Sequence, residues 1–121
     1  MSPSLGNGKI CYLEIPTTNA GRSAAFYRDA LGWTPRTRSD GAIAFDDGVG
    51  EVSGTWVSGR PPNRDAGTLV YVMVDDISET MRRVEEHGGE IVLRPPSSGE
   101  TIAHFRDPDG NLFGLYQEPA R

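Results

Sequence analysis

The sequence of 121 residues contains a single cysteine, Cys11, and a single lysine, Lys9. One cysteine cannot form an internal disulfide, and it excludes zinc sites and redox motifs that need several cysteines. The lone lysine lies near the N-terminus, which argues against Schiff-base catalysis. Long apolar runs are also missing, because the longest one, Leu69–Val74, is far too short to span a bilayer. These absences exclude a disulfide-stabilised scaffold and a membrane-spanning protein.

Positive charge is scarce as well. Twelve basic residues stand against 17 acidic residues, giving a formal net charge of −5. No cluster of basic residues offers a face for nucleic acid, so we expect neither a nucleic-acid partner nor a membrane partner. Residues 1–8 lack the basic and apolar regions of a signal peptide. We therefore expect a disordered N-terminus over residues 1–8 and a cytoplasmic protein.

Turn-forming residues are abundant, and a strand followed by a helix occurs twice. The chain has 15 glycines and 9 prolines, which is typical of short strands and many turns. Asn19 and Asp76, both suited to begin a helix, lie 57 residues apart and indicate a duplicated unit. The predicted strands are Ile10–Ile15 and Leu69–Val74, and the predicted helices are Ala20–Leu31 and Ile77–His87.

Three further strands are predicted after each helix. They are Trp33–Arg38, Ala42–Phe45 and Val52–Val57 in the first half, and Glu90–Leu93, Thr101–Arg106 and Leu112–Gln117 in the second. The polar, proline-containing segment 58–67 predicts a linker between them. The sequence thus predicts an α+β fold of two tandem βαβββ modules, residues 9–57 and 68–119.

Several short motifs carry a family resemblance along nearly the whole chain. They are Glu14-Ile15-Pro16, Asn19 with Phe26-Tyr27, Leu31-Gly32-Trp33, Val74-Asp75-Asp76, and the run from Phe105 to Asn111. In this order the sequence resembles the vicinal oxygen chelate superfamily of glyoxalase, bleomycin-resistance and extradiol dioxygenase proteins. The resemblance covers residues 9–119 as one domain. It implies a curled mixed sheet that forms a cup, built within one chain or across a homodimer.

The resemblance places a ligand cup on the sheet faces opposite the helices. Strand alternation then selects the side chains that face it, while Cys11, Trp33 and Trp56 are expected in the core. Tyrosines offer flat apolar faces with polar tips, and His104 would titrate there near neutral pH. The predicted ligand-binding residues are Tyr12, Glu14, Leu69, Tyr71, Met73, His104, Gly114 and Tyr116.

Metal-dependent members of the superfamily hold a divalent cation with His, Glu or Gln side chains at four cup positions. The resemblance maps these positions onto Tyr12, Val57, Leu69 and Gly114. Leucine, valine and glycine side chains have no donor atoms, so we expect no metal and no other cofactor. A shifted metal site stays open as an alternative, built from Glu14, Asp47, Glu51 and His104.

The leading prediction is a metal-free protein of the glyoxalase and bleomycin-resistance type. It would bind a small organic molecule, aromatic or antibiotic-like, in an aromatic-lined cup. The alternative is a lyase, isomerase or hydrolase that works without the usual metal through His104 and Glu14. A metal-dependent lactoylglutathione lyase is a third possibility, which the missing ligands oppose.

Overall fold

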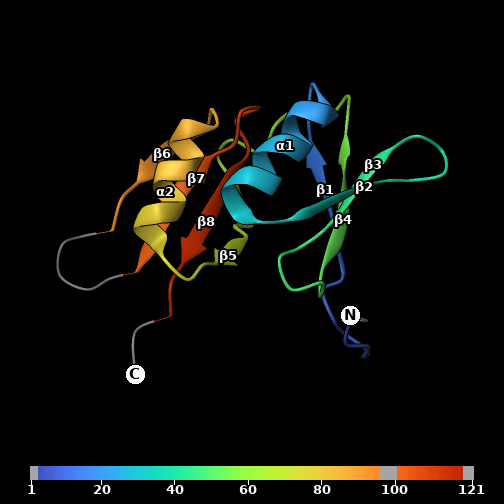
Figure 1. The fold of residues 1–121 in the computed structure, drawn as a ribbon, viewed down its shortest axis with the longest axis horizontal. Helices are drawn as coiled ribbons and strands as arrows, with labels where there is room; N and C mark the ends of the chain where they lie inside the picture. Colours follow the sequence, from blue (N-terminus) through green and yellow to red (C-terminus); the bar gives the residue numbers. More distant parts are fainter. Residues whose placement is uncertain (1–2, 96–100, 119–121) are drawn as a thin grey trace. The chain divides into compact units, whose positions relative to one another are not determined.

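The computed structural model describes residues 3–95 and 101–118, and the chain divides into two compact units, Met1–Pro61 and Pro62–Arg121 (Figure 1). The boundary falls within the predicted linker 58–67. Each unit has the element order strand, helix and three strands. The predicted α+β duplication is therefore confirmed. Residues 1 and 2 of the predicted N-terminal segment and residue 119 of the predicted second module lie outside the described residues.

The first unit forms a four-stranded mixed sheet in the order β1-β4-β3-β2. Strand β1 runs parallel to β4, and the other neighbours are antiparallel. The helix α1 contacts β2, β3 and β4. The elements are β1 (Tyr12–Pro16), α1 (Ala20–Leu31), β2 (Thr34–Thr37), β3 (Ile43–Asp46) and β4 (Ser53–Val57).

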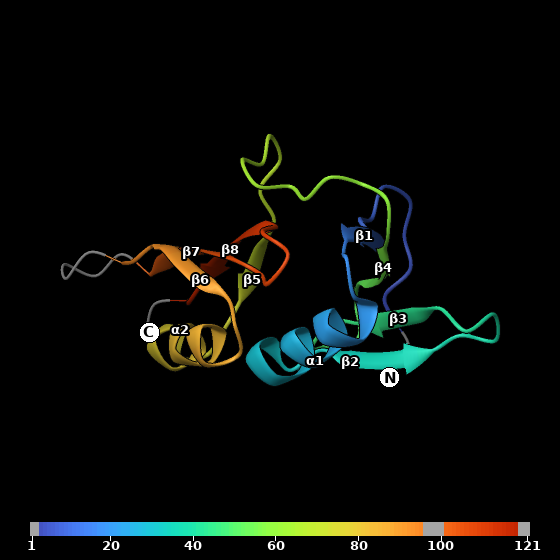
Figure 2. The same ribbon diagram turned by 90° about the horizontal axis from the view of Figure 1, so that it is seen from above.

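The second unit repeats this topology in the order β5-β8-β7-β6, with β5 parallel to β8. Figure 2 shows its helix, α2, on one face of its sheet, where it contacts β6 and β7. In the part of the chain that is described, neither helix has the length and apolarity to cross a membrane. The elements are β5 (Tyr71–Met73), α2 (Ile77–Glu86), β6 (Glu90–Leu93), β7 (Ile102–Arg106) and β8 (Leu112–Tyr116).

The helix starts follow from the predicted capping residues. The Asn19 side chain accepts a hydrogen bond from the Arg22 amide, and the Asp76 side chain accepts one from the Glu79 amide. Each bond satisfies an amide that has no partner within its own helix. Helix α1 ends at Gly32, whose φ of 74° is the left-handed conformation that glycine adopts without steric cost.

The core of the first unit is aromatic. Trp33 stacks between Tyr27 and Phe45, with ring centroids 4.8 and 4.7 Å away, and Trp56 packs against both outer rings. Trp33 and Trp56 are buried, as predicted. Cys11 was expected in the core, and this expectation is wrong: its side chain is exposed because it precedes Tyr12, the first paired residue of β1.

Equivalent residues of the two units are 57 positions apart up to the helices, but this spacing changes after the helices. Thr17 donates its amide hydrogen to the Val57 carbonyl, and Val74 donates to the Tyr116 carbonyl at the equivalent place. The first residues of these pairs are 57 positions apart, and the second are 59 apart. The spacing changes because the connection from β6 to β7 is longer than the equivalent connection from β2 to β3. The structural equivalent of Gly114 is therefore Thr55, and the predicted equivalence with Val57 is wrong.

The N-terminal segment contacts the turn between β3 and β4. The Ser4 amide and the Lys9 ammonium both donate to Glu51 Oε1, each over 3.1 Å. The hydrogen bond from Lys9 lowers the pKa of Glu51 below its ordinary value, and the bonds from Ser4 act in the same direction. The expected disorder of residues 1–8 stays a prediction.

The close approach at Gly54 predicts a sharp stability effect. A Cβ atom at this position would lie 2.3 Å from the Leu13 carbonyl oxygen and 2.3 Å from Phe45 Cζ. We expect Gly54→Ala to lower the free energy of unfolding by about 1–3 kcal/mol, because the extra carbon overpacks the core. Urea denaturation would measure it. Gly67→Ala is the control, since nothing lies within 4 Å of its Cβ position. Equal stability of the two variants would contradict the packing argument.

Candidate functional site

The face of the second sheet that does not contact α2 carries most of the predicted ligand-binding residues. Alternation along β7 and β8 buries Phe105 and Leu115 toward the helix, which leaves His104 and Gly114 on the opposite face. We call this surface the open face of the second unit. Leu69 lies just before β5 and is half-buried. The open face comprises Tyr71, Met73, His104, Gly114 and Tyr116.

The centre of the open face is a contact between Tyr71 and His104. The Tyr71 hydroxyl lies 2.9 Å from His104 Nε2, and the two rings meet edge-on at a centroid distance of 5.7 Å. Gly114 lies between them, since it pairs with Tyr71 on one side and with His104 on the other. The structure thus brings together three of the predicted site residues from three neighbouring strands.

Apolar surface surrounds this contact. Tyr71 is 46% exposed and Met73 is 67% exposed, which is high for large side chains on a sheet. Leu93, which pairs with His104 across β6 and β7, is 47% exposed. A planar apolar molecule could bury such side chains, and burial of apolar area is the main source of affinity in small-molecule sites.

Tyr116 adds a hydroxyl group near the end of β8. Its phenol donates a hydrogen bond of 3.1 Å to Glu118 Oε2. This bond to a carboxylate raises the pKa of Tyr116 above its ordinary value. The phenol therefore stays protonated through the neutral range, and it can present a ring face and a hydroxyl to a ligand.

Tyr12 and Glu14 lie on the equivalent face of the first unit and are both exposed. Glu14 accepts a hydrogen bond of 2.6 Å from the Arg60 guanidinium, and the Tyr12 hydroxyl lies 3.5 Å from Arg38 Nη1. A solvent-exposed carboxylate that is already paired with a guanidinium lacks the desolvation that activates a general base. The surroundings of Glu14 are suited to an electrostatic contact.

A polar network on the same face was not predicted. Ser53 Oγ donates to Asp46 over 2.6 Å, and Arg36 donates to the same carboxylate over 3.3 Å. These two side chains lower the pKa of Asp46, with Ser53 the larger cause. The signal was present in the sequence, because the three residues fall on the outward positions of β2, β3 and β4 once the strands are paired.

The residues at the superfamily's metal positions do not fit a divalent cation. Corrected by the observed pairing, these positions hold Tyr12, Thr55, Leu69 and Gly114. Leucine and glycine offer no side-chain donor, and the Thr55 hydroxyl donates to the Ile43 carbonyl over 2.7 Å. Over residues 3–95 and 101–118, no three His, Cys, Asp or Glu side chains gather in a group that could hold a metal ion. The shifted site considered from the sequence combines residues of both units and stays a prediction.

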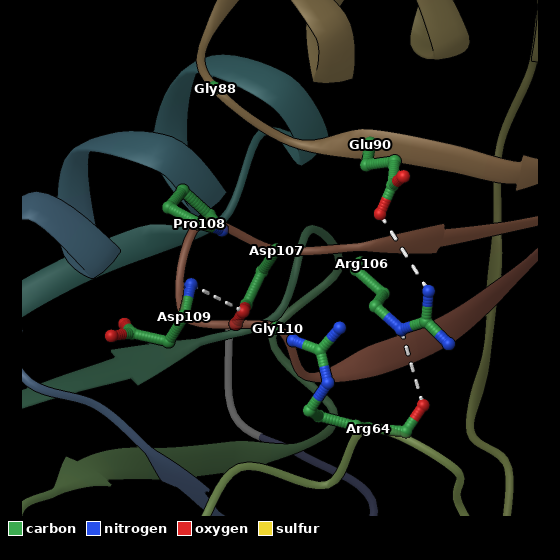
Figure 3. A pocket seen from close by; sticks show the side chains of 8 residues that line it. All are labelled: Arg64, Gly88, Glu90, Arg106, Asp107, Pro108, Asp109 and Gly110. Atoms are coloured by element: carbon green, nitrogen blue, oxygen red, sulfur yellow. Dashed lines mark hydrogen bonds and ion pairs between the residues drawn. The ribbon is translucent and has the colours of Figure 1, made fainter.

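A cavity of about 230 Å³ lies at the turn between β7 and β8 (Figure 3), and none of the predicted site residues lines it. The buried Asp107 carboxylate accepts hydrogen bonds from the Asp109 and Asn111 amides there and fixes the predicted Asp-Pro-Asp-Gly turn. The Arg106 guanidinium donates to the Arg64 carbonyl over 3.3 Å. The cavity is lined by Arg64, Gly88, Glu90, Arg106, Asp107, Pro108, Asp109 and Gly110.

Comparison with known proteins agrees with the fold. A family model described as the Glyoxalase/Bleomycin resistance protein/Dioxygenase superfamily matches residues 9–115. A glyoxylase-like domain-containing protein from Didymella fabae is 27% identical over 132 residues, which cover 95% of this chain and 98% of that protein.

Two solved structures show the likeness in three dimensions. The fosfomycin resistance protein FosX from Listeria monocytogenes has a TM-score of 0.73 at 18% identity, covering 93% of this chain and 92% of that one. TnmS3, an antibiotic binding protein from Streptomyces sp. CB03234, has a TM-score of 0.68 at 21% identity, covering 96% and 100%. At these identities the likeness establishes the fold.

Proposed function

Since the chain belongs to the Glyoxalase/Bleomycin resistance protein/Dioxygenase superfamily, we propose that it binds a small organic molecule of aromatic or antibiotic-like type without a metal ion. The observation that carries this proposal is the open face of the second unit. There Tyr71 and Met73 stay 46% and 67% exposed beside the hydrogen bond of Tyr71 to His104. Exposed aromatic and apolar side chains with a few polar groups are typical of small-molecule sites.

Non-covalent binding needs fewer functional groups than catalysis does. An apolar face and hydrogen-bonding tips suffice, whereas catalysis needs an activated nucleophile, a base or a Lewis acid. The donor set at the metal positions does not fit a cation, and Glu14 is paired with Arg60. Among structural neighbours, one is named as an antibiotic binding protein and another as a fosfomycin resistance protein. These names support a small-molecule ligand.

The second candidate is a metal-independent lyase, isomerase or hydrolase that uses His104 with Glu14. It is supported by the Tyr71 hydroxyl, which lies 2.9 Å from His104 Nε2 and orients the imidazole. The ion pair of Glu14 with Arg60 opposes it. Turnover of a bound compound by the wild type, abolished in His104→Ala, would favour this candidate over simple binding.

The proposed site predicts which aromatic residues matter for affinity. For a planar compound selected by screening, Tyr71→Ala and Tyr116→Ala should each raise the Kd about fivefold or more, because a lost aromatic contact costs about 1–3 kcal/mol. Isothermal titration calorimetry would measure the change. Val49→Ala is the control, since Val49 is 67% exposed but lies between β3 and β4. Unchanged affinity in both tyrosine variants would refute the assignment.

Metal content gives a separate prediction. Purified protein dialysed under mild conditions should retain well below one equivalent of zinc, nickel, manganese or iron, because Leu69 and Gly114 supply no ligand atoms. Elemental analysis would measure the content. A stoichiometric metal that survives dialysis would contradict a metal-free site.

The sheet edges predict association of two chains. In the described sheets β1 and β5 each have one neighbouring strand, and an unpaired strand edge can pair with another chain. We expect a homodimer, in keeping with the cup that the family resemblance implies. Light scattering at micromolar concentration would measure the mass, and a monomer mass would rule the dimer out.

A further inference from the structure

We infer that Tyr71 and His104 act as a hydrogen-bonding pair that recognises an O–H or N–H donor on a planar aromatic ligand, and that Gly114 is the positioning residue that makes the pair possible. The inference rests on the proposed binding function and deepens it. It names the chemical class of the ligand and a residue that determines specificity without needing to touch the ligand.

The first step is the distance that the two side chains must bridge. Tyr71 on β5 and His104 on β7 are separated by β8, and both are in register with Gly114. Neighbouring strands lie about 4.8 Å apart, so the two backbones are roughly 10 Å apart. Their side chains meet at 2.9 Å because the Tyr71 ring lies across β8 and does not stand upright on the sheet.

The second step is the role of Gly114. A Cβ atom there would lie 2.5 Å from both Cδ2 and Cε2 of Tyr71, a separation that real Cβ atoms do not show. The backbone of Gly114 does not explain the glycine, since Gly114 is not among the glycines with a positive φ. Room for the Tyr71 ring is the requirement that explains it. Any larger residue would lift the ring away from His104.

The third step is the direction of the hydrogen bond. A phenol O–H is a better donor than a neutral imidazole N–H, and an imidazole nitrogen is a better acceptor than a phenol oxygen. We therefore assign the Tyr71 hydroxyl as the donor and His104 Nε2 as the acceptor. The phenol hydrogen is then used, and the Tyr71 oxygen offers only lone pairs to a ligand. A ligand hydroxyl, amide or amine fits this oxygen, and an ether or carbonyl does not.

The surroundings define the rest of the ligand. Met73 and Leu93 are exposed beside the pair and offer apolar surface for a flat molecule. The ring of Tyr71 is the aromatic partner for stacking. The ligand class that satisfies both features is a planar aromatic compound with a hydroxyl or amino group at its edge.

A matched pair of probes tests this inference. 2-Naphthol and 2-methoxynaphthalene share the ring system, and they differ in whether the oxygen carries a hydrogen. We expect the wild-type protein to bind 2-naphthol roughly three- to tenfold more tightly, which is the usual worth of one hydrogen bond. The methyl ether has an additional apolar carbon, so burial alone would favour it. Fluorescence titration of the protein with each probe would measure both affinities.

Substitutions at Tyr71 and Gly114, alone and together, separate the roles of these residues. Tyr71→Phe keeps the ring but lacks the hydroxyl oxygen, so it should bind 2-naphthol no more tightly than 2-methoxynaphthalene. Gly114→Ala should also lose the preference, with a changed ¹⁵N chemical shift at His104 Nε2, in protein that stays folded by circular dichroism. In a Tyr71→Ala background the ring is gone, so the added Gly114→Ala should change neither affinity further. Gly67→Ala, whose Cβ would contact nothing within 4 Å, is the matched control.

The possible results test this inference separately from the proposed aromatic-binding function on which it rests. Failure of the wild type to bind either probe would overturn the proposed aromatic-binding function. Equal binding of both probes, or preference for the methyl ether, would leave that function standing and overturn the recognition pair. A preference that persists in Gly114→Ala, or a further loss when this change is added to Tyr71→Ala, would overturn the positioning role of Gly114.

Discussion

One helix covers one face of each four-stranded sheet, and the position of every other side chain depends on this arrangement. Because successive residues of a strand point to opposite faces, burying Phe105 and Leu115 under α2 forces His104 and Gly114 onto the other face. In this unit α2 contacts β6 and β7. Side chains on the face away from α2 are therefore not constrained by packing against the helix, and the sequence is free to vary their chemistry.

The two units use this freedom differently, although they share a topology. The equivalent pairs are Glu14 with Thr55 in the first unit and Tyr71 with Gly114 in the second. In the first, the threonine hydroxyl is bound to a backbone carbonyl, and the glutamate reaches the Arg60 guanidinium. In the second, the glycine leaves room for a ring to lie flat. Around these pairs the first sheet presents charge and the second presents aromatic and apolar surface, which is why the ligand-binding proposal centres on the second unit.

The sequence was sufficient to predict the elements, because their signals are local. Helix α1 and strand β6 have the predicted bounds, and both N-caps are where the polar residues indicated. Two predictions failed for reasons that are not local. The equivalent of Gly114 depends on how a longer connection shifts the pairing of the last strand, and Cys11 lies one residue before its strand becomes paired. The contact of Tyr71 with His104 could not be predicted either, since alternation assigns a face to each side chain and does not say which way a ring leans.

Gly114 bears on both the absence of metal ligands and the proposed mode of ligand binding. The family resemblance implies a metal ligand at this position of the last strand, whereas Gly114 has no side chain and leaves room above β8. The Tyr71 ring fills that space to within 2.5 Å of where a Cβ would lie. Replacing the glycine by a glutamate would therefore displace the Tyr71 ring from its contact with His104, because the first side-chain carbon would collide with the ring. Gly114 thus explains both the absence of a metal-ligand donor at this position and the contact of Tyr71 with His104. The proposed site would recognise its ligand through a phenol, an imidazole and apolar contacts.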